Sequence, residues 1–349
     1  MSALFRVESI ERSRQDTFEY ALEKIMRYIR DPRSQNVCFN GGDVGRVFVQ
    51  VAGRWQWMPE TLTRAERERI ITLLATSEEP AQAIDSTRSR LQCDLPYGLK
   101  GRVQAFSPPI EDWIGIIRIR AKSVSTFEDY AARGELSVNP APRIVDRTPA
   151  GTPIEALRAA IARRDRILIV GENGSGKTTF MDTVLLEIER LFPDERVAIV
   201  QDRHELQGQF TNQIELMTLR EQIHFEVNGA VSRYRYDWLD ALEDVLRCAV
   251  DRIFWGELRE KRSAEGLMMA SYAGTDGMVA TMHANSVYDT FTRLEHLLPP
   301  GTPREMVAGF VDFIVEMRQD ANGKRGVANM ARAFGYVNGK YIIEPAVAG

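Results

Sequence analysis

The sequence predicts an α/β fold with a mostly parallel, doubly wound sheet, preceded by a smaller α+β domain. Three observations predict it: a glycine-rich loop between an apolar run and a helical pattern, an alternation of strand and helix patterns after residue 150, and a change of composition near residue 140. The Pro- and Gly-containing stretch 136–152 is typical of an exposed linker. We therefore expect an N-terminal domain at 1–135 and an α/β domain at 153–349.

Helical and strand patterns alternate irregularly in the first 135 residues. An amphipathic helix is expected at about 15–29. A second helix is expected to begin after Thr63, where Glu66 three residues on completes a capping-box pattern, and to end near Ala75. Short β runs are expected at 37–40 and 46–51 as a hairpin, and further at 55–57, 91–95, 102–106 and 113–119. These patterns predict the small α+β domain.

Strands and helices alternate regularly after the linker. Strand patterns are expected at 167–170, 197–200, 253–255 and 278–281. Helical patterns are expected at 154–163, 178–191, 237–249, 263–272 and 287–298. Runs at 313–317, 327–332 and 336–343, with an Asn338-Gly339 turn, predict antiparallel β structure at the C-terminal end.

The glycine-rich loop at 171–178 fits the pattern G-x-x-x-x-G-K-[ST] and lies between the expected strand and helix. Glycines let backbone N–H groups turn inward as an anion nest, and the helix N-terminus adds its positive dipole end. We expect Lys177 to reach the β- and γ-phosphates and the Thr178 hydroxyl to ligate Mg²⁺. The predicted nucleotide-binding residues of this segment are Gly171, Glu172, Asn173, Gly174, Ser175, Gly176, Lys177, Thr178 and Thr179. A plain surface turn would not need the flanking strand and helix.

Acidic residues and one histidine follow three other expected strands, at the edge of the sheet where phosphates would lie. Glu257 is the predicted catalytic carboxylate and a metal ligand; the alternative is a surface residue opening a helix. Asp202 is a predicted metal ligand and Glu205 a predicted catalytic group, although acids often cap turns after strands. His283 is predicted to sense the γ-phosphate, against the alternative of a structural histidine.

The composition bears on the cellular compartment and on the classes of partner that we expect. The formal net charge is −4 with both signs in each half, so bulk charge does not indicate a nucleic-acid-binding module. The three cysteines are far apart and form no C-x-x-C pair, which favours a reducing compartment and makes zinc unlikely by spacing. No signal-peptide pattern and no apolar run near 20 residues is present, so we expect a cytoplasmic protein without a transmembrane segment.

Together these segments resemble the secretion and conjugation traffic ATPases, which span type IV secretion, conjugal transfer, type II secretion and type IV pilus motors. Four boxes match in order: 171–178 the Walker A box, 201–205 the Asp box, 254–257 the Walker B box, and 277–286 the His box, which continues into 293–295. Similarity upstream, from Arg102 to Gly134, looks most like the conjugal-transfer and type IV secretion branch.

The resemblance implies a RecA-like P-loop ATPase domain, with ATP and Mg²⁺ as cofactors, behind an N-terminal domain. It also implies a homo-oligomeric ring, usually a hexamer, that associates peripherally with the inner membrane through components of a secretion, conjugation or pilus apparatus. Arginines from the N-terminal domain reach the phosphates in this family. Arg118 matches that position best, with Arg120 and Arg102 behind it, although each alone would be a solvated strand residue.

Two positions depart from the family pattern: Gln201 stands where the Asp box usually opens with Glu, and Ala249 where an arginine is usual. The leading interpretation is a cytoplasmic ring-forming ATPase that couples Mg-ATP hydrolysis to substrate transfer or assembly by a type IV secretion or conjugation apparatus. One alternative is a pilus retraction motor. A nucleic-acid translocase is another, although near-neutral charge leads us to expect no stable nucleic-acid binding. The departure at Gln201 also leaves a non-hydrolysing scaffold open.

Overall fold

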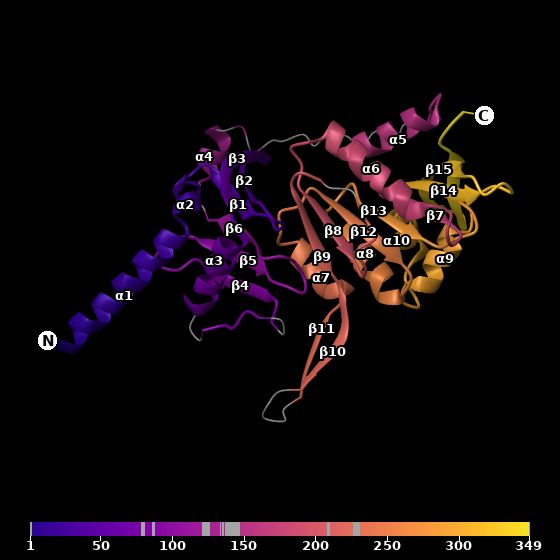
Figure 1. The fold of residues 1–349 in the computed structure, drawn as a ribbon. Coiled ribbons are helices and arrows are strands. Elements are labelled where there is room, and N and C mark those ends of the chain that lie inside the picture. Colours follow the sequence, from indigo (N-terminus) through magenta and orange to yellow (C-terminus); the bar gives the residue numbers. More distant parts are fainter. Residues whose placement is uncertain are drawn as a thin grey trace. The chain divides into compact units, whose positions relative to one another are not determined.

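The computed structural model divides the chain into two compact units (Figure 1). One unit comprises Met1–Ser107 and Asp112–Arg147, and the other Pro108–Glu111 and Thr148–Gly349. The structure describes residues 2–77, 81–85, 88–120, 126–132, 134, 136, 147–207, 210–225 and 231–348. Most of the expected linker, residues 137–146, lies outside the described residues, and the two units are described separately.

The first unit is built on a six-stranded sheet in the order β3-β2-β1-β6-β5-β4, with every neighbouring pair antiparallel. Its strands are β1 (Ser34–Phe39), β2 (Gly45–Val51), β3 (Arg54–Leu62), β4 (Arg90–Asp94), β5 (Gly101–Phe106) and β6 (Ile114–Ile119). Its helices are α1 (Ser2–Ala21), α2 (Glu23–Arg30), α3 (Arg64–Ser77) and α4 (Phe127–Ala132). The expected hairpin is β1–β2, and the expected capping box is present, since the Thr63 Oγ1 accepts from the Glu66 amide at 3.3 Å.

The single helix expected at about 15–29 is wrong in its bounds. The chain forms two helices, α1 and α2, which are separated at Leu22, a residue that is fully buried. Ile25, Met26 and Ile29 of α2 are buried in the same apolar cluster as the inward side chains of the sheet. The helical period of the sequence continues through this point, so the pattern gives no signal for the break.

The second unit is built on an eight-stranded sheet in the order β16-β15-β14-β7-β13-β12-β8-β9. Six strands, from β14 to β9, are parallel, and β15 and β16 are antiparallel to their neighbours. The strands are β7 (Ile167–Gly171), β8 (Val197–Gln201), β9 (Gln213–Met217), β12 (Arg252–Leu258), β13 (Val279–Met282), β14 (Phe313–Gln319), β15 (Arg325–Val337) and β16 (Lys340–Pro345). A separate antiparallel ribbon of β10 (Leu219–Phe225) and β11 (Val231–Tyr236) extends away from this sheet (Figure 1).

Helices cover both faces of the large sheet, so the doubly wound α/β fold is confirmed. The helices are α5 (Pro153–Ala162), α6 (Lys177–Leu191), α7 (Trp238–Val245), α8 (Lys261–Tyr272), α9 (Thr290–Leu297) and α10 (Arg304–Gly309). On one face, apolar residues of α5 and α6 form one core with Phe254 of β12. On the other face, Trp255 packs against Trp238 of α7 and lies close to Gly266 of α8. Both faces of β12 are buried, as in parallel sheets generally.

The C-terminal strands differ in part from expectation. The run at 313–317 is not purely antiparallel, because β14 pairs in parallel with β7 on one side and antiparallel with β15 on the other. An apolar run shows that a strand is buried but not the direction of its neighbours. The expected turn at Asn338-Gly339 joins β15 to β16, and both residues have positive φ, as a type I′ hairpin requires. In the described part of the chain no helix is long and apolar enough to cross a membrane.

Candidate active site

The loop between β7 and α6 has a backbone that only glycine allows at two points. A Cβ on Gly171 would lie 2.3 Å from the Met317 carbonyl oxygen of the neighbouring strand β14. Gly176, directly before α6, has a φ of 94° in the left-handed region. The Oγ of Ser175 is buried in this loop without a hydrogen-bond partner in the described structure. A loop so constrained, opening a helix, has the geometry of an anion nest.

Lys177, the first residue of α6, is folded back over this loop. Its Nζ donates to the carbonyl oxygens of Gly171 at 3.1 Å and Glu172 at 2.9 Å, and lies 3.3 Å from the Nδ1 of His283. Burial lowers the pKa of the ammonium group, while the carboxylates of Glu257 and Glu205 raise it. The ammonium group is therefore held by carbonyl oxygens and nearby carboxylates, partners that a phosphate can replace.

His283 follows β13 and links Lys177 to the carboxylate of Glu257. Its Nε2 lies 2.7 Å from the Glu257 Oε1, while its Nδ1 faces Lys177. An ammonium group has only donors, so Nδ1 must accept and Nε2 must carry the proton given to Glu257. The hydrogen-bond pattern thus assigns a neutral imidazole with the proton on Nε2. An open groove of about 460 Å³, bordered by His283, Glu172 and Asn173, gives a ligand access to this ring.

Glu257 is directed into the site by a β-bulge. The register of β12 against β13 skips between Trp255 and Glu257, which makes Gly256 an extra residue. The Thr281 Oγ1 donates to the carbonyl oxygen of Gly256 at 2.8 Å and satisfies this interrupted part of the ladder. Bulges often re-aim a side chain beside an active site. Glu257 lies within β12, not at a helix start, since α8 begins at Lys261.

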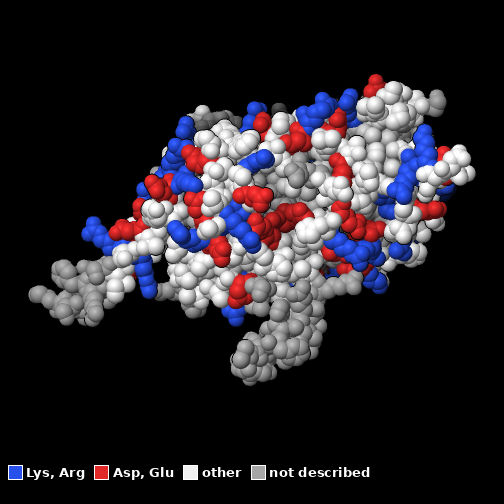
Figure 2. Space-filling view, viewed as in Figure 1, with Lys and Arg blue, Asp and Glu red and all other residues white. Residues whose placement is uncertain are grey.

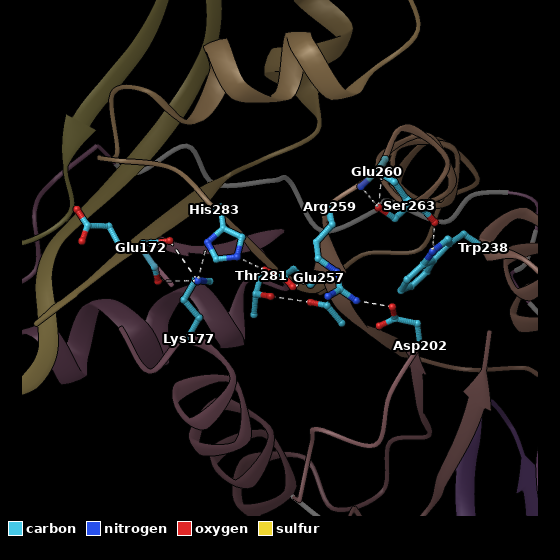
Figure 3. A network of polar contacts seen from close by, with 12 residues as sticks. Glu172, Lys177, Asp202, Trp238, Glu257, Arg259, Glu260, Ser263, Thr281 and His283 are labelled. Atoms are coloured by element: carbon cyan, nitrogen blue, oxygen red, sulfur yellow. Dashed lines mark hydrogen bonds and ion pairs between the residues drawn. The ribbon is translucent and has the colours of Figure 1, made fainter. Parts of the chain in front are cut away.

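A polar chain crosses the carboxyl ends of four neighbouring strands, as Figure 3 shows. Beyond Glu257, the guanidinium of Arg259 places its Nε 3.2 Å from the Glu257 Oε2, and its Nη2 pairs with the Oδ2 of Asp202. The members of the chain, in order, are Lys177, His283, Glu257, Arg259 and Asp202. Arg259 was not among the predicted site residues. The available signal was its place two residues after Glu257, since alternate strand residues share a face.

Gln201 holds the loop that carries Asp202 and Glu205. Its Oε1 accepts from the amides of Glu205 and Leu206 at 3.2 and 3.3 Å. Its Nε2 donates to the Oε1 of Glu215 on β9 at 2.6 Å. A glutamate at position 201 would set two carboxylates against each other here. Gln201, the residue that departs from the family pattern, therefore has a carboxylate partner in Glu215.

The predicted metal ligands Thr178, Asp202 and Glu257 line one small cavity, together with Glu205. Among the described residues, no group of three or more His, Cys, Asp or Glu is arranged to hold a metal ion by itself. A hydroxyl and two carboxylates are hard oxygen donors, and Mg²⁺ is commonly held by one or two carboxylates plus substrate phosphates. These residues fit Mg²⁺ bound together with nucleotide. Thr179, on the first turn of α6, is exposed.

The three predicted arginines belong to the first unit. Arg102 of β5 and Arg118 of β6 are cross-strand partners, so they lie on one face of the sheet. Arg120 pairs with Asp94 at 2.8 Å, and Arg102 lies 3.7 Å from the same carboxylate. Both have exposed side chains. Their contact with nucleotide stays a prediction.

Comparison with known proteins places these features in a family context. The model of a family described as "Type II/IV secretion system protein" matches residues 151–319. The conjugal transfer protein TrbB of Rhizobium radiobacter is 27% identical over 335 residues, which cover 92% of this chain and 94% of that protein. The type IV secretion system protein VirB11 of Brucella suis is 30% identical over 331 residues, which cover 88% of this chain and 87% of that protein.

A solved structure shows the same fold. The crystal structure of the VirB11 ATPase from the Brucella suis type IV secretion system, in complex with sulphate, aligns with a TM-score of 0.71. The alignment covers 92% of this chain and 95% of that one at 24% sequence identity. The RecA-like α/β fold with an N-terminal α+β domain is thereby confirmed.

Proposed function

The chain belongs to the type II/IV secretion ATPase family, and we propose that it couples Mg-ATP hydrolysis to substrate transfer or assembly by a type IV secretion or conjugation apparatus. One observation carries the proposal: the unbroken polar chain from Lys177 to Asp202, which joins the phosphate loop to the acidic residues beside it. The names of the relatives, a conjugal transfer protein and type IV secretion proteins, support this branch of the family.

The loop at 171–179 binds the phosphates, and Lys177 exchanges its two carbonyl partners for phosphate oxygens. Thr178, Asp202 and Glu257 would hold Mg²⁺, which would neutralise charge on the phosphate oxygens. Glu257 orients the attacking water and accepts its proton, and Glu205 assists from the same cavity. Both oxygens of Glu257 are engaged, one by His283 and one by Arg259, so this carboxylate must give up a partner before it can act.

His283 reports the presence of the γ-phosphate through its partner Lys177. When the ammonium turns to a phosphate, Nδ1 loses the donor that now faces it; by taking up a proton from solvent at that nitrogen, the ring can then donate to the phosphate. Because Nε2 remains bonded to Glu257, the change reaches the catalytic carboxylate directly. We further propose that Arg118, with Arg120 and Arg102, contributes guanidinium groups to the bound phosphates, because a guanidinium fork suits the charge of a transferring phosphoryl group.

Glu257→Gln tests the catalytic assignment. We expect ATP turnover to fall by about 10²–10⁴-fold, the usual contribution of general acid–base catalysis, while a fluorescent nucleotide still binds. Ser263→Ala, close by in α8, is a control that leaves the site carboxylates in place. Turnover at the wild-type rate in the glutamine variant would refute the role of Glu257.

The motor assignment is tested through partners and assembly. We expect native mass spectrometry to show an assembly of six copies, as a hexameric ring requires. We also expect inner-membrane components of a secretion or conjugation system to co-purify with the chain. A pilus retraction motor would instead co-purify with pilus components. Figure 2 shows basic and acidic side chains interspersed over the described part of the visible face. Salt-dependent binding of single-stranded DNA that stimulates turnover would favour the translocase alternative.

A further inference from the structure

Arg259 stands between the two carboxylates that the proposed function assigns to the metal. Its Nε is 3.2 Å from the Glu257 Oε2, and its Nη2 pairs with the Asp202 Oδ2 (Figure 3). Its backbone amide also donates to the carbonyl oxygen of Glu257 at 3.1 Å, which fixes the start of the side chain. One guanidinium therefore bridges the ends of β12 and β8.

The bridging position leaves little room for another cation. The cavity bounded by Thr178, Asp202, Glu205, Glu257 and Arg259 has a volume of about 10 Å³. This is roughly the space that one water molecule needs. Mg²⁺ generally keeps several waters in its shell, so a hydrated divalent ion does not fit while the guanidinium lies there.

The charges in this cavity also account for the position of Arg259. Asp202 and Glu257 carry like charges, and Glu205 borders the same cavity. Like charges that share a site repel unless a cation lies between them. Arg259 supplies that cation. The side chain is 37% exposed, which leaves it able to move toward solvent.

We propose that Arg259 is a positioning residue that holds Asp202 and Glu257 ready for the metal and competes with a divalent cation for the same two carboxylates. By this competition it lowers the affinity of the two carboxylates for a divalent cation that binds without nucleotide. The inference rests on the proposed function of this site and names a residue and a regulation that the family resemblance does not supply.

The test measures metal binding to the nucleotide-free full chain, with Mn²⁺ as the probe and electron paramagnetic resonance to count the free ion. We expect Arg259→Met to bind Mn²⁺ about tenfold more tightly than the wild type, because two carboxylates lose their counter-cation. Arg259→Gln is expected to do the same. It is measured in parallel so that the test stands even when one of the two variants does not fold. Arg259→Lys keeps the charge and is expected to bind as weakly as the wild type.

Two controls locate the effect. Arg262→Met removes an exposed arginine three positions away, whose partner is Asp237 at 2.7 Å, and should leave Mn²⁺ affinity unchanged. Asp202→Asn added to Arg259→Met should abolish the gain. Unchanged affinity in both Arg259→Met and Arg259→Gln, tight binding by the lysine variant, or a gain that survives Asp202→Asn would each overturn the proposal.

The outcome is separable from the proposed function. A chain that gains Mn²⁺ affinity in Arg259→Met but does not couple ATP turnover to an apparatus would refute the motor and leave the counter-cation role standing. A chain whose turnover depends on Glu257 but whose Mn²⁺ affinity ignores Arg259 would refute only the counter-cation role.

Discussion

Both ends of the large sheet carry charged side chains linked by ion pairs, but the arginine at the centre of each group differs in burial. At the amino ends of the strands, Glu195 pairs with Arg252 and with Arg164, each at 2.5 Å, and the Arg252 side chain is 1% exposed. At the carboxyl ends, the chain through Glu257 and Arg259 is partly open, and the Arg259 side chain is 37% exposed. Both chains satisfy their charges, so ionic pairing alone does not mark a functional site.

The two groups of ion pairs differ in whether their members can exchange protein partners for ligand atoms. The amino-end cluster buries its central arginine, Arg252, whose Nη1 also donates to the Ile161 carbonyl oxygen, while the Arg164 side chain at its edge is 38% exposed. Removing one member of such a cluster leaves a buried charge without its partner and away from water. The carboxyl-end chain terminates at Lys177, beside a loop shaped for an anion, and its members can trade protein partners for ligand atoms. The first chain stabilises the fold, and the second prepares it for a ligand.

Replacing one glutamate by glutamine at each end of the sheet should test this difference most sharply. Glu257→Gln is expected to lower turnover by about 10²–10⁴-fold while the midpoint of thermal unfolding stays within a few degrees of the wild type. Parallel turnover and differential scanning fluorimetry measurements check this. A large drop in the unfolding midpoint would show that the carboxyl-end chain is structural as well.

Glu195→Gln is the matched change at the amino end. We expect a loss of about 3–5 kcal/mol in the free energy of unfolding, because Arg252 and Arg164 are left without their shared carboxylate. Urea unfolding followed by circular dichroism measures the loss. Turnover per folded molecule should be unchanged, and a selective loss of turnover would erase the distinction between the two ends.

Gln201→Glu tests a contact of intermediate burial, next to the carboxyl-end chain. The new carboxylate would face Glu215, where the amide now donates at 2.6 Å, and we expect a loss of about 1–3 kcal/mol in unfolding free energy. Adding Glu215→Gln restores a donor between the two positions and should recover most of the loss. A double-mutant cycle by urea unfolding checks the coupling; strictly additive losses would contradict it.

Glu187 gives the surface baseline for the comparison. It joins Arg158 of α5 to Arg190 of α6, and hydrogen bonds from Arg190 and Arg158 lower its pKa from 4.5 to about 2. We expect Glu187→Gln to cost less than about 1 kcal/mol, as exposed pairs do.

The pH dependence of this small effect has a definite sign. A carboxyl whose pKa is lower in the folded protein stabilises it fully above pH 4.5, and loses that contribution as the pH falls toward 2. The difference between wild type and Glu187→Gln should therefore shrink between pH 6 and pH 3 in urea unfolding. A difference that grows on acidification would contradict the assignment.

The sequence predicted the parts of the site that follow strands. Lys177, Glu257 and His283 were predicted together because the carboxyl ends of parallel strands meet at one edge of a sheet. Their convergence into one polar chain is now seen in the structure. The α/β class and the hairpin at Asn338-Gly339 had equally local signals, since alternation and turn chemistry are written in short segments.

Other features depend on partners distant in sequence. Gln201 looked like a lost carboxylate, and its match to Glu215 could not be inferred because strand β9 was not predicted. The parallel pairing of β14 with β7 joins residues almost 150 positions apart, for which no local pattern exists. Arg259 is not among the predicted site residues, since its pairing with Asp202 requires knowing that β8 and β12 are neighbours.

The bulge at Gly256 adds one residue to strand β12, and this determines which face of the sheet each later side chain of the strand occupies. Side chains alternate along a strand, so one extra residue exchanges the two faces. If Gly256 instead paired regularly with Thr281, position 257 would share the face of Trp255, among buried side chains, and Leu258 would turn to the other face. Gly256 is therefore a spacer that is left out of the pairing with β13, so that Glu257 takes the place opposite Thr281. A strand that paired regularly here would turn the Glu257 carboxylate toward the core, although the sequence around it was unchanged.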